Sequence, residues 1–215
     1  MCAACLSGCF CEVAILDLLN DKIKPVYLRY LAASFGSALI VSIYSMVDMA
    51  MVGQYEGPNG AAALAVVAPV WNLIYSLGML TGAGGSVIYS IIKGQSEKRT
   101  GLENEYFTVA VTGSLILAAM AWLMLIFFEV PLLMLFGADE TLLPLAQDYV
   151  RPIKTVLPLF LINYILAAFL RNDNNPGLAT IATLAGGVFN MFGDYFFVFT
   201  CDMGVFGAGL ATALG

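Results

Sequence analysis

Long runs of hydrophobic residues alternate with short polar turns along most of the chain. Five of these runs are long enough for a helix to cross a bilayer, which takes about 20 residues. A sixth run, residues 205–215, opens in the same way but is too short to cross within this sequence. The pattern therefore predicts an all-α fold, a polytopic bundle of transmembrane helices. The expected complete spans are residues 26–51, 61–92, 106–128, 149–170 and 178–200.

The second run is longer than a straight crossing requires, and Pro69 and several glycines interrupt it. We expect one long, bent or tilted helix, in which the glycines permit close helix packing or form a hinge. Residues 17–29 are expected to form an amphipathic lead-in with a break at Pro25. A short surface helix is expected within residues 129–148.

One amide and two carboxylates lie inside runs that are otherwise apolar: Asp48 in the first run, and Asn190 and Asp194 in the fifth. Asn190 and Asp194 are one helical turn apart and therefore share a helix face. A carboxylate within a membrane helix costs about 2.5–3.5 kcal/mol on insertion scales, and such residues usually face a bundle interior or a water-filled cavity. The three side chains predict either an ion or proton site or polar contacts that hold helices together.

The positions of the two acids along their helices favour the ion site. If the first and fifth spans run in the same direction, Asp48 and Asp194 lie at matching depth, about 25–30 Å from the inner surface. Carboxylates at the same depth on separate helices would repel each other, so one would gain affinity for a proton or the two would attract a cation.

Composition supports a membrane protein and limits its chemistry. Hydrophobic residues make up 60% of the chain and charged residues 11%, against about 25% charged residues in a soluble domain. The chain has no histidine, so a carboxylate would have to carry any transported proton. The acids lie mostly in short loops, so the net charge of −6 does not indicate a soluble partner. The lipid bilayer is the expected environment, and no nucleic acid is expected as a partner.

The basic residues set the expected orientation, since loops retained in the cytoplasm carry the excess of Lys and Arg. Most of them fall on one side of the expected bundle, and only Arg151 and Lys154 fall on the other. We therefore expect a multi-pass protein of the cell inner or plasma membrane with a cytoplasmic N-terminus. The residues on the basic side are Lys22, Lys24, Arg29, Lys93, Lys98, Arg99 and Arg171.

A cysteine-rich and amphipathic cytoplasmic segment is expected at residues 1–25, before the membrane lobe at residues 26–215. The cysteine spacing could hold a metal ion or take a palmitoyl group, or the segment could be a disordered tail with reduced thiols. No signal peptide is expected, because no basic residue precedes the apolar stretch at residues 6–16. The cysteines are Cys2, Cys5, Cys9 and Cys11.

Four short motifs, each weak alone, become more specific through their order and spacing. They are Val47-Asp48 followed by Val52-Gly53-Gln54, the glycine-rich second span ending in Lys93-Gly94, Asn190 with Asp194, and the opening of the sixth run at residues 204–212. This set resembles the multidrug and toxic compound extrusion (MATE) transporters over about residues 18–215.

The resemblance implies a secondary active antiporter that expels amphipathic, often cationic, drug-like compounds in exchange for Na⁺ or H⁺. It also implies that Asp48, Asn190, Asp194 and Thr212 bind the coupling ion, with Na⁺ as the bound metal if coupling uses sodium, and no other cofactor. Members have twelve spans in two six-helix lobes, and the rocking of these lobes gives alternating access. The chain is therefore expected to be an N-lobe fragment, cut short in the sixth helix, whose missing partner is the C-terminal lobe.

Three other functions remain open from the sequence. A lipid-linked oligosaccharide flippase of the same superfamily would be expected to line its cavity with several basic residues, whereas no basic residue lies deep in an expected span. An intramembrane aspartyl protease could use two carboxylates, but its Gly-x-Gly-Asp motif is missing around Asp194, so no enzyme is expected. A non-transporting membrane scaffold would leave the paired acids unexplained.

Overall fold

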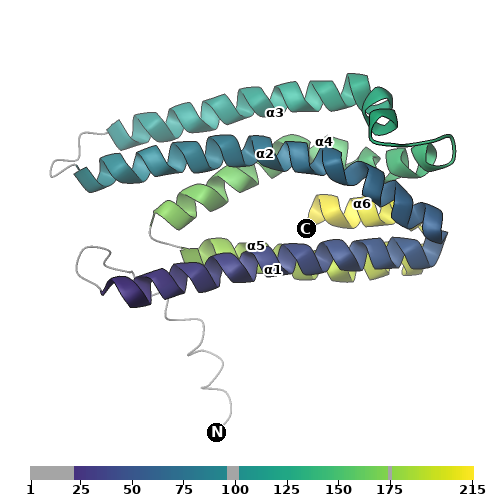
Figure 1. The fold of residues 1–215 in the computed structure, drawn as a ribbon, viewed down its shortest axis with the longest axis horizontal. Coiled ribbons are helices and arrows are strands. Elements are labelled where there is room, and N and C mark those ends of the chain that lie inside the picture. Colours follow the sequence, from purple (N-terminus) through teal and green to yellow (C-terminus); the bar gives the residue numbers. More distant parts are fainter. Residues whose placement is uncertain (1–21, 96–101, 174–175) are drawn as a thin grey trace, which may run out of the picture.

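The structure, a computed structural model, describes residues 22–95, 102–173 and 176–215. Within these ranges the chain forms the expected all-α bundle, without a β-strand (Figure 1). Five helices are long and apolar enough to cross a membrane when α5 is counted together with η1. The elements are α1 (Ile23–Glu56), α2 (Pro58–Gln95), α3 (Leu102–Leu135), α4 (Leu142–Asn172), α5 (Pro176–Asp194), the π-helix η1 (Tyr195–Thr200) and α6 (Gly204–Leu214).

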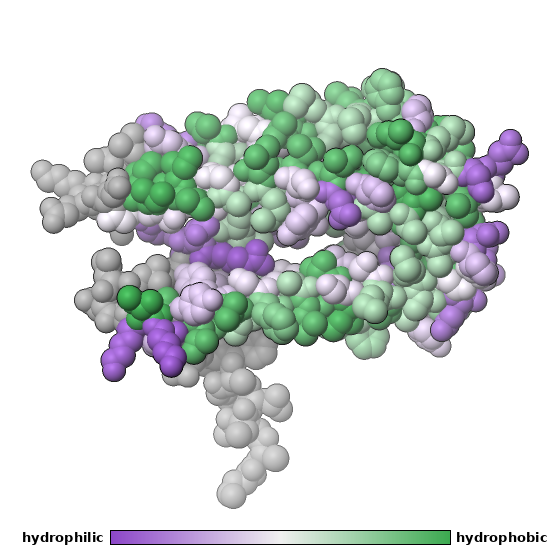
Figure 2. All heavy atoms as spheres, in the orientation of Figure 1, coloured by the Kyte–Doolittle hydropathy of each residue, from purple (hydrophilic) through white to green (hydrophobic). Residues whose placement is uncertain are grey.

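The helices form two groups, with α6 between them. α1 lies along α5, while α2 packs against both α3 and α4 (Figure 1). α6 contacts α4 and α5, so its side chains can reach both groups. Hydrophobic side chains cover much of the length of the bundle, and hydrophilic ones gather mainly at its two ends (Figure 2). This distribution fits a bundle whose sides face lipid.

The first helix begins earlier than the predicted span. α1 starts at Ile23 and runs through Pro25 without a break. Proline is tolerated there because the first turn of a helix has no intrahelical partner for its N–H groups. The expected break at Pro25 is therefore wrong, and residues up to Arg29 belong to α1. The rest of the predicted N-terminal segment, with Cys2, Cys5, Cys9 and Cys11, lies outside the described residues.

The second run forms one continuous helix, as expected, and three of its glycines lie where α3 or α4 packs closely against it. A Cβ atom placed on Gly78 would lie 2.9 Å from the ring of Tyr164 in α4. A Cβ atom on Gly82 would lie 3.3 Å from Ala168, also in α4. Gly85 approaches Ala110 of α3 in the same way. Membrane helices associate through such small residues, because they let two backbones come close together.

A short helical segment follows the third span, as expected. Backbone geometry departs from helical at Phe128 (φ −118°, ψ 20°), and beyond this kink a short second part of α3 runs through Pro131 to Leu135. α4 then begins at Leu142. The sequence pattern placed the end of the third span at the kink, because Glu129 and Pro131 resemble the start of a loop.

Because α4 begins at Leu142, Lys154 lies more than three turns inside it, and not at the edge of a span as the sequence suggested. Its ammonium group donates a hydrogen bond to Glu129 of α3, with Nζ 2.6 Å from Oε2. Lys154 is largely buried, and its charge is paired with that of an acid. Arg151 on the same helix is exposed.

A tight turn fixes where α6 begins. Asp202 and Gly204 both adopt positive φ angles, of 55° and 54°. The hydroxyl of Tyr55, near the end of α1, donates a hydrogen bond to Asp202 Oδ1 at 2.6 Å. A side chain on Gly204 would collide with the ring of Tyr55, since a Cβ atom there would lie 2.7 Å from it. The last turn of α1 therefore holds the start of α6, and this sets the position of α6 relative to α1.

We predict that replacing Gly209 of α6 with alanine destabilises the bundle. A Cβ atom there would collide with the carbonyl group of Tyr149 in α4 and would lie 3.0 Å from Pro152. Neither group is the end of a flexible side chain, so we expect a loss of about 1–3 kcal/mol, the usual range for overpacking. Thermal unfolding of the detergent-solubilised protein measures it.

Gly113→Ala in α3 is the matched control, because nothing lies within 4 Å of a Cβ atom at that position. It should leave the unfolding temperature unchanged or raise it slightly, since alanine favours a helix more than glycine does. Equal stability of the two variants would contradict the close α4–α6 contact.

Candidate functional site

Asp48 lies inside the bundle and is held by a tyrosine from another helix. Its exposed fraction is 5%, and it sits in the last third of α1, about two turns before the helix ends at Glu56. The hydroxyl of Tyr149, from α4, donates a hydrogen bond to Asp48 Oδ2 at 2.5 Å. The second carboxylate oxygen, Oδ1, is buried and has no hydrogen-bond partner among the described residues.

The same tyrosine connects Asp48 to two more of the predicted site residues. Its hydroxyl lies 3.2 Å from Oγ1 of Thr212 in α6. Asn190 of α5 donates a hydrogen bond from Nδ2 to the same Thr212 oxygen, also at 3.2 Å. All four side chains are buried. The predicted residues Asp48, Asn190 and Thr212 thus lie on one hydrogen-bonded chain that joins α1, α4, α6 and α5.

Asp194 lies near this chain but does not belong to it. It follows Asn190 by one helical turn, ends α5 and is fully buried. Its carboxylate is close enough to Asp48 for the two charges to interact. Both of its side-chain oxygens nevertheless lack a hydrogen-bond partner among the described residues. Contacts between helices satisfy the other site residues in part, but not Asp194.

Glycines of α5 bring these groups together. A Cβ atom on Gly187 would lie 2.7 Å from Ile40 and 3.2 Å from Tyr44, both in α1. A Cβ atom on Gly193 would lie 3.0 Å from Ala211 in α6. Because these positions carry no side chain, α5 can approach α1 on one side and α6 on the other. Asn190 lies between the two glycines in sequence and is placed at the meeting point of the three helices.

The site contains buried oxygens that no protein donor among the described residues satisfies: one on Asp48, one on Asn190 and both on Asp194. A buried polar group without a hydrogen bond is costly, and a buried charge without a partner costs more. Carboxylate, amide and hydroxyl oxygens are the ligands that a hard cation prefers, and a proton could neutralise the same carboxylates. The residues present therefore fit a small hard cation such as Na⁺, or a proton.

Tyr149 is the functional residue that the sequence analysis missed. The pattern placed it at the start of the fourth span, where a tyrosine commonly marks a membrane interface. In the structure it lies about two turns inside α4 and is 5% exposed. A tyrosine at a span boundary gives no signal of its partner, because Asp48 is 101 positions away in sequence. Only the hydrogen bond that it donates across the bundle to Asp48 of α1 identifies it.

Aromatic side chains of α2 and α4 contact one another between the two helices. The rings of Tyr75 and Tyr164 meet edge to face at 5.1 Å between centroids. Trp71 and Phe160 meet in the same way at 5.0 Å. Tyr44, one turn before Asp48, lies within electrostatic reach of that carboxylate and of Tyr75. Ring faces of this kind attract organic cations as well as apolar groups.

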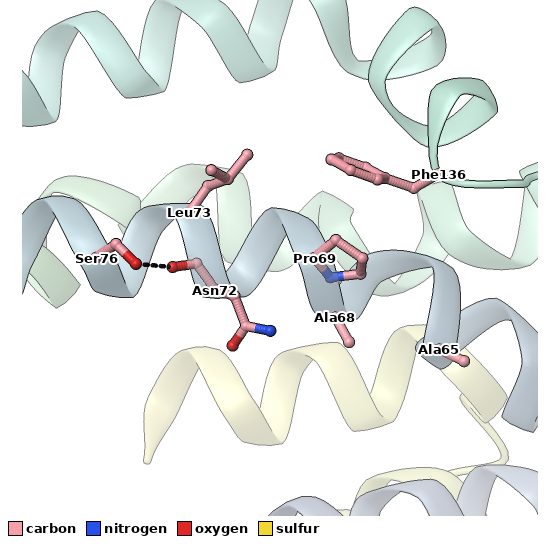
Figure 3. Close-up of a pocket in the computed structure, with 7 residues that line it drawn as sticks. All are labelled: Ala65, Ala68, Pro69, Asn72, Leu73, Ser76 and Phe136. Atoms are coloured by element: carbon pink, nitrogen blue, oxygen red, sulfur yellow. Dashed lines mark hydrogen bonds between the residues drawn. The ribbon is translucent and has the colours of Figure 1, made fainter.

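A separate cavity of about 400 Å³ opens beside the proline of α2 (Figure 3). Its walls are largely apolar, and Phe136 covers one side. Pro69 has no N–H to donate to the carbonyl of Ala65, which leaves an acceptor on the cavity wall. The Asn72 side chain adds an amide that projects away from the helix (Figure 3). The lining residues are Ala65, Ala68, Pro69, Asn72, Leu73, Ser76 and Phe136.

Comparison with known proteins matches the chain to a family of transporters. The MatE family model matches residues 33–196. The multidrug export protein MepA of Staphylococcus saprophyticus is 28% identical over 180 residues, which are 83% of this chain and 39% of the relative. MepA of Staphylococcus aureus is 25% identical over 176 residues, 82% of this chain and 39% of the relative.

Solved structures agree with these sequence matches. The outward-facing conformation of a multidrug resistance MATE family transporter superimposes with a TM-score of 0.78 at 25% identity, over 87% of this chain and 41% of the other. The MATE multidrug transporter DinF-BH gives a TM-score of 0.77 at 26% identity, over 85% of this chain and 41% of the other.

The chain spans about two fifths of the length of the curated relatives that it matches. The family model covers most of the chain, and the fold, the helix order and the solved neighbours agree with it. The chain belongs to the MatE family of transporters.

Proposed function

We propose that this chain serves as the N-lobe of a secondary active multidrug efflux antiporter. It would export amphipathic, often cationic, compounds in exchange for Na⁺ or H⁺ that enters at Asp48, Asn190, Asp194 and Thr212. The observation that carries the proposal is the set of buried oxygens without a donor among the described residues, above all the two of Asp194. The MepA relatives are named multidrug export proteins, and the chain spans 39% of their length. A second lobe would supply the rest of the transport path.

The proposed mechanism rests on two carboxylates that share one buried site. Tyr149 orients Asp48 and also contacts Thr212, while Asp194 is held by the backbone of α5 and has no donor of its own among the described residues. A bound Na⁺ or proton would supply the positive charge that relieves the repulsion between the two acids. Without that charge, α1 and α5 are pushed apart at the site, and the negative interior attracts a cationic substrate. Each ligand can shift the balance only by its different affinity for the two arrangements.

The proposed substrate contacts lie on α2 and on the aromatic side chains beside it. The cavity at Pro69 offers apolar walls, the amide of Asn72 and the carbonyl of Ala65, to which Pro69 has no N–H to donate. Its described lining residues carry no charge, so it would hold the apolar body of a substrate better than its cationic group. The rings of Tyr44, Tyr75 and Tyr164 suit the cationic group, and Tyr44 lies within electrostatic reach of Asp48. An apolar cavity together with aromatic rings that attract a cation suits amphipathic compounds.

The first prediction concerns efflux in cells that produce the transporter with both lobes. Asp48→Asn and Asp194→Asn should each abolish resistance to a cationic dye such as ethidium while the protein remains in the membrane. Asparagine keeps the size of the side chain but removes the charge that the substrate and the coupling ion would compete for.

Asp173→Asn is the control, because Asp173 pairs with Lys93 at the opposite end of α4 and is exposed. It should leave resistance intact, since exposed ion pairs contribute little. Resistance that survives in Asp48→Asn or Asp194→Asn would contradict the proposed site.

The second prediction concerns the coupling ion itself. An ion that binds only the folded protein stabilises it, by about 2.7 kcal/mol at 100 times the dissociation constant. The purified protein should therefore unfold at a higher temperature when Na⁺ replaces choline if coupling uses sodium, or when the pH is lowered if coupling uses protons. Asp194→Asn should abolish whichever response the native protein gives. A native protein that responds to neither change would refute an ion site at these residues.

A further inference from the structure

A partly buried ion pair lies outside the candidate ion site. Lys154 of α4 and Glu129 of α3 form an ion pair at 2.6 Å, and their side chains are 23% and 10% exposed. Both belong to helices that are apolar enough to span a membrane. Charged groups in such helices are rare and usually have a function, so the pair needs an explanation. Neither residue belongs to the ion site or to the substrate contacts proposed above.

A second contact from α3 meets the same residue of α4. The indole nitrogen of Trp122 donates a hydrogen bond to the backbone carbonyl of Lys154 at 2.7 Å. In an uninterrupted helix this carbonyl would accept from the N–H four residues later, but that residue is Pro158, which has none. Trp122 supplies the missing donor. α3 therefore holds Lys154 twice, through its side chain and through its backbone.

α4 needs such support at this place. Pro152 and Pro158 each remove one backbone hydrogen bond, so the segment between them is less constrained than a regular helix. Tyr149 lies three residues before Pro152, and Lys154 lies between the two prolines. Five residues correspond to a rotation of about 140° and a rise of about 7.5 Å, so the two side chains leave α4 on nearly opposite sides. Tyr149 faces Asp48 and Thr212, while Lys154 faces α3.

We propose that Glu129, Lys154 and Trp122 form a clamp that holds the proline-interrupted part of α4 in the rotation at which Tyr149 reaches Asp48. Glu129 and Lys154 are then positioning residues, which act on the candidate ion site through Tyr149. The placement of Tyr149 follows from the contacts alone, whereas the consequence for ion binding rests on the proposed function.

An effect of the clamp on the position of Tyr149 can be distinguished from a general loss of stability. Removing one charge would leave the other buried and alone, which destabilises a protein for reasons unrelated to Tyr149. Replacing both charges avoids this, because a buried ion pair can often be exchanged for uncharged residues without loss of stability. The test variant is therefore E129Q/K154M. Its matched control is K93M/D173N, which removes the ion pair between Lys93 and Asp173 at the other end of α4.

The position of the tyrosine hydroxyl can be read without any transport assay. 3-Fluorotyrosine placed at position 149 of the purified protein gives a ¹⁹F resonance that is sensitive to the hydrogen bond with Asp48. Asp48→Asn defines the resonance of a tyrosine whose carboxylate partner is lost. E129Q/K154M should move the resonance toward that reference, K93M/D173N should leave it in place, and the exchanged pair E129K/K154E should bring it back toward the native position.

A native resonance in E129Q/K154M would overturn the proposal, as would an equal shift in the control. If E129Q/K154M does not fold, Trp122→Phe takes its place, since it removes one donor and leaves both charges paired. It should shift the resonance in the same direction by a smaller amount, and an unchanged resonance there would overturn the clamp.

The consequence for ion binding is tested with ²²Na⁺ on the same proteins. Loss of groups that orient a metal ligand typically lowers metal affinity 10- to 100-fold, and we expect about a tenfold loss in E129Q/K154M. Tyr149→Phe should lower the affinity by itself, and adding it to E129Q/K154M should cause no further loss, because the clamp acts through that hydroxyl. Additive losses would contradict the clamp. A native protein that binds no ²²Na⁺ would contradict sodium coupling in the proposed function, and the ¹⁹F result would still decide the clamp.

Discussion

The hydrogen bond between Tyr149 and Asp48 is the contact on which the arrangement of the site depends. It places a carboxylate of α1 against α4 inside an apolar bundle, at 2.5 Å. The same hydroxyl reaches Thr212 of α6, and through it Asn190 of α5, so one tyrosine connects four helices. Close contacts at Gly187, Gly193 and Gly209 bring these helices together around the site. Hydrogen bonds offset only part of the free-energy cost of burying the carboxylates. The carboxylate oxygens that lack a partner among the described residues determine what the site can bind.

Glycine and proline have complementary roles around this contact. Glycines lie where two helices must touch: Gly187 and Gly193 on α5, and Gly209 against the backbone of Tyr149. Prolines lie where a helix must bend or offer a free carbonyl, as Pro158 does for the indole of Trp122. If Asp48 and Asp194 are to meet in one conformation and separate in another, the helices must pack closely. They must also contain segments that can bend.

The sequence predicted the residues that are unusual for their surroundings. Asp48, Asn190 and Asp194 stand out because polar groups are rare in apolar helices, and the structure buries all three. Thr212 followed only from the family resemblance, since a threonine in a membrane helix is common. Tyr149 could not be predicted, because its partner comes from a distant part of the chain and tyrosines are ordinary at span boundaries.

The helix ends were harder to predict than the helices, for a physical reason. Hydropathy marks where a chain can lie in lipid, but a helix continues as long as its backbone hydrogen bonds can form. Glu129 and Pro131 marked the end of the third span, where α3 kinks at Phe128 but continues to Leu135, and Pro25 suggested a break where α1 begins. The fourth span was expected to begin at residue 149, which placed Lys154 at the span's edge, although α4 begins at Leu142 and Lys154 pairs with Glu129 of α3. A charged residue can lie inside an apolar helix when another helix supplies the opposite charge. The hydropathy pattern of one helix does not show which residue of another helix lies beside it.

The central claim is that the buried carboxylates of Asp48 and Asp194 exchange a cation or a proton. Infrared difference spectroscopy of the carboxyl bands, recorded as Na⁺ is added at constant pH and as pH is lowered without Na⁺, tests it most directly. The account predicts a change in the carboxyl bands under one of the two conditions, which disappears in Asp194→Asn and in Asp48→Asn. Carboxyl bands that remain unchanged under both conditions, or that change equally in the variants, would contradict it.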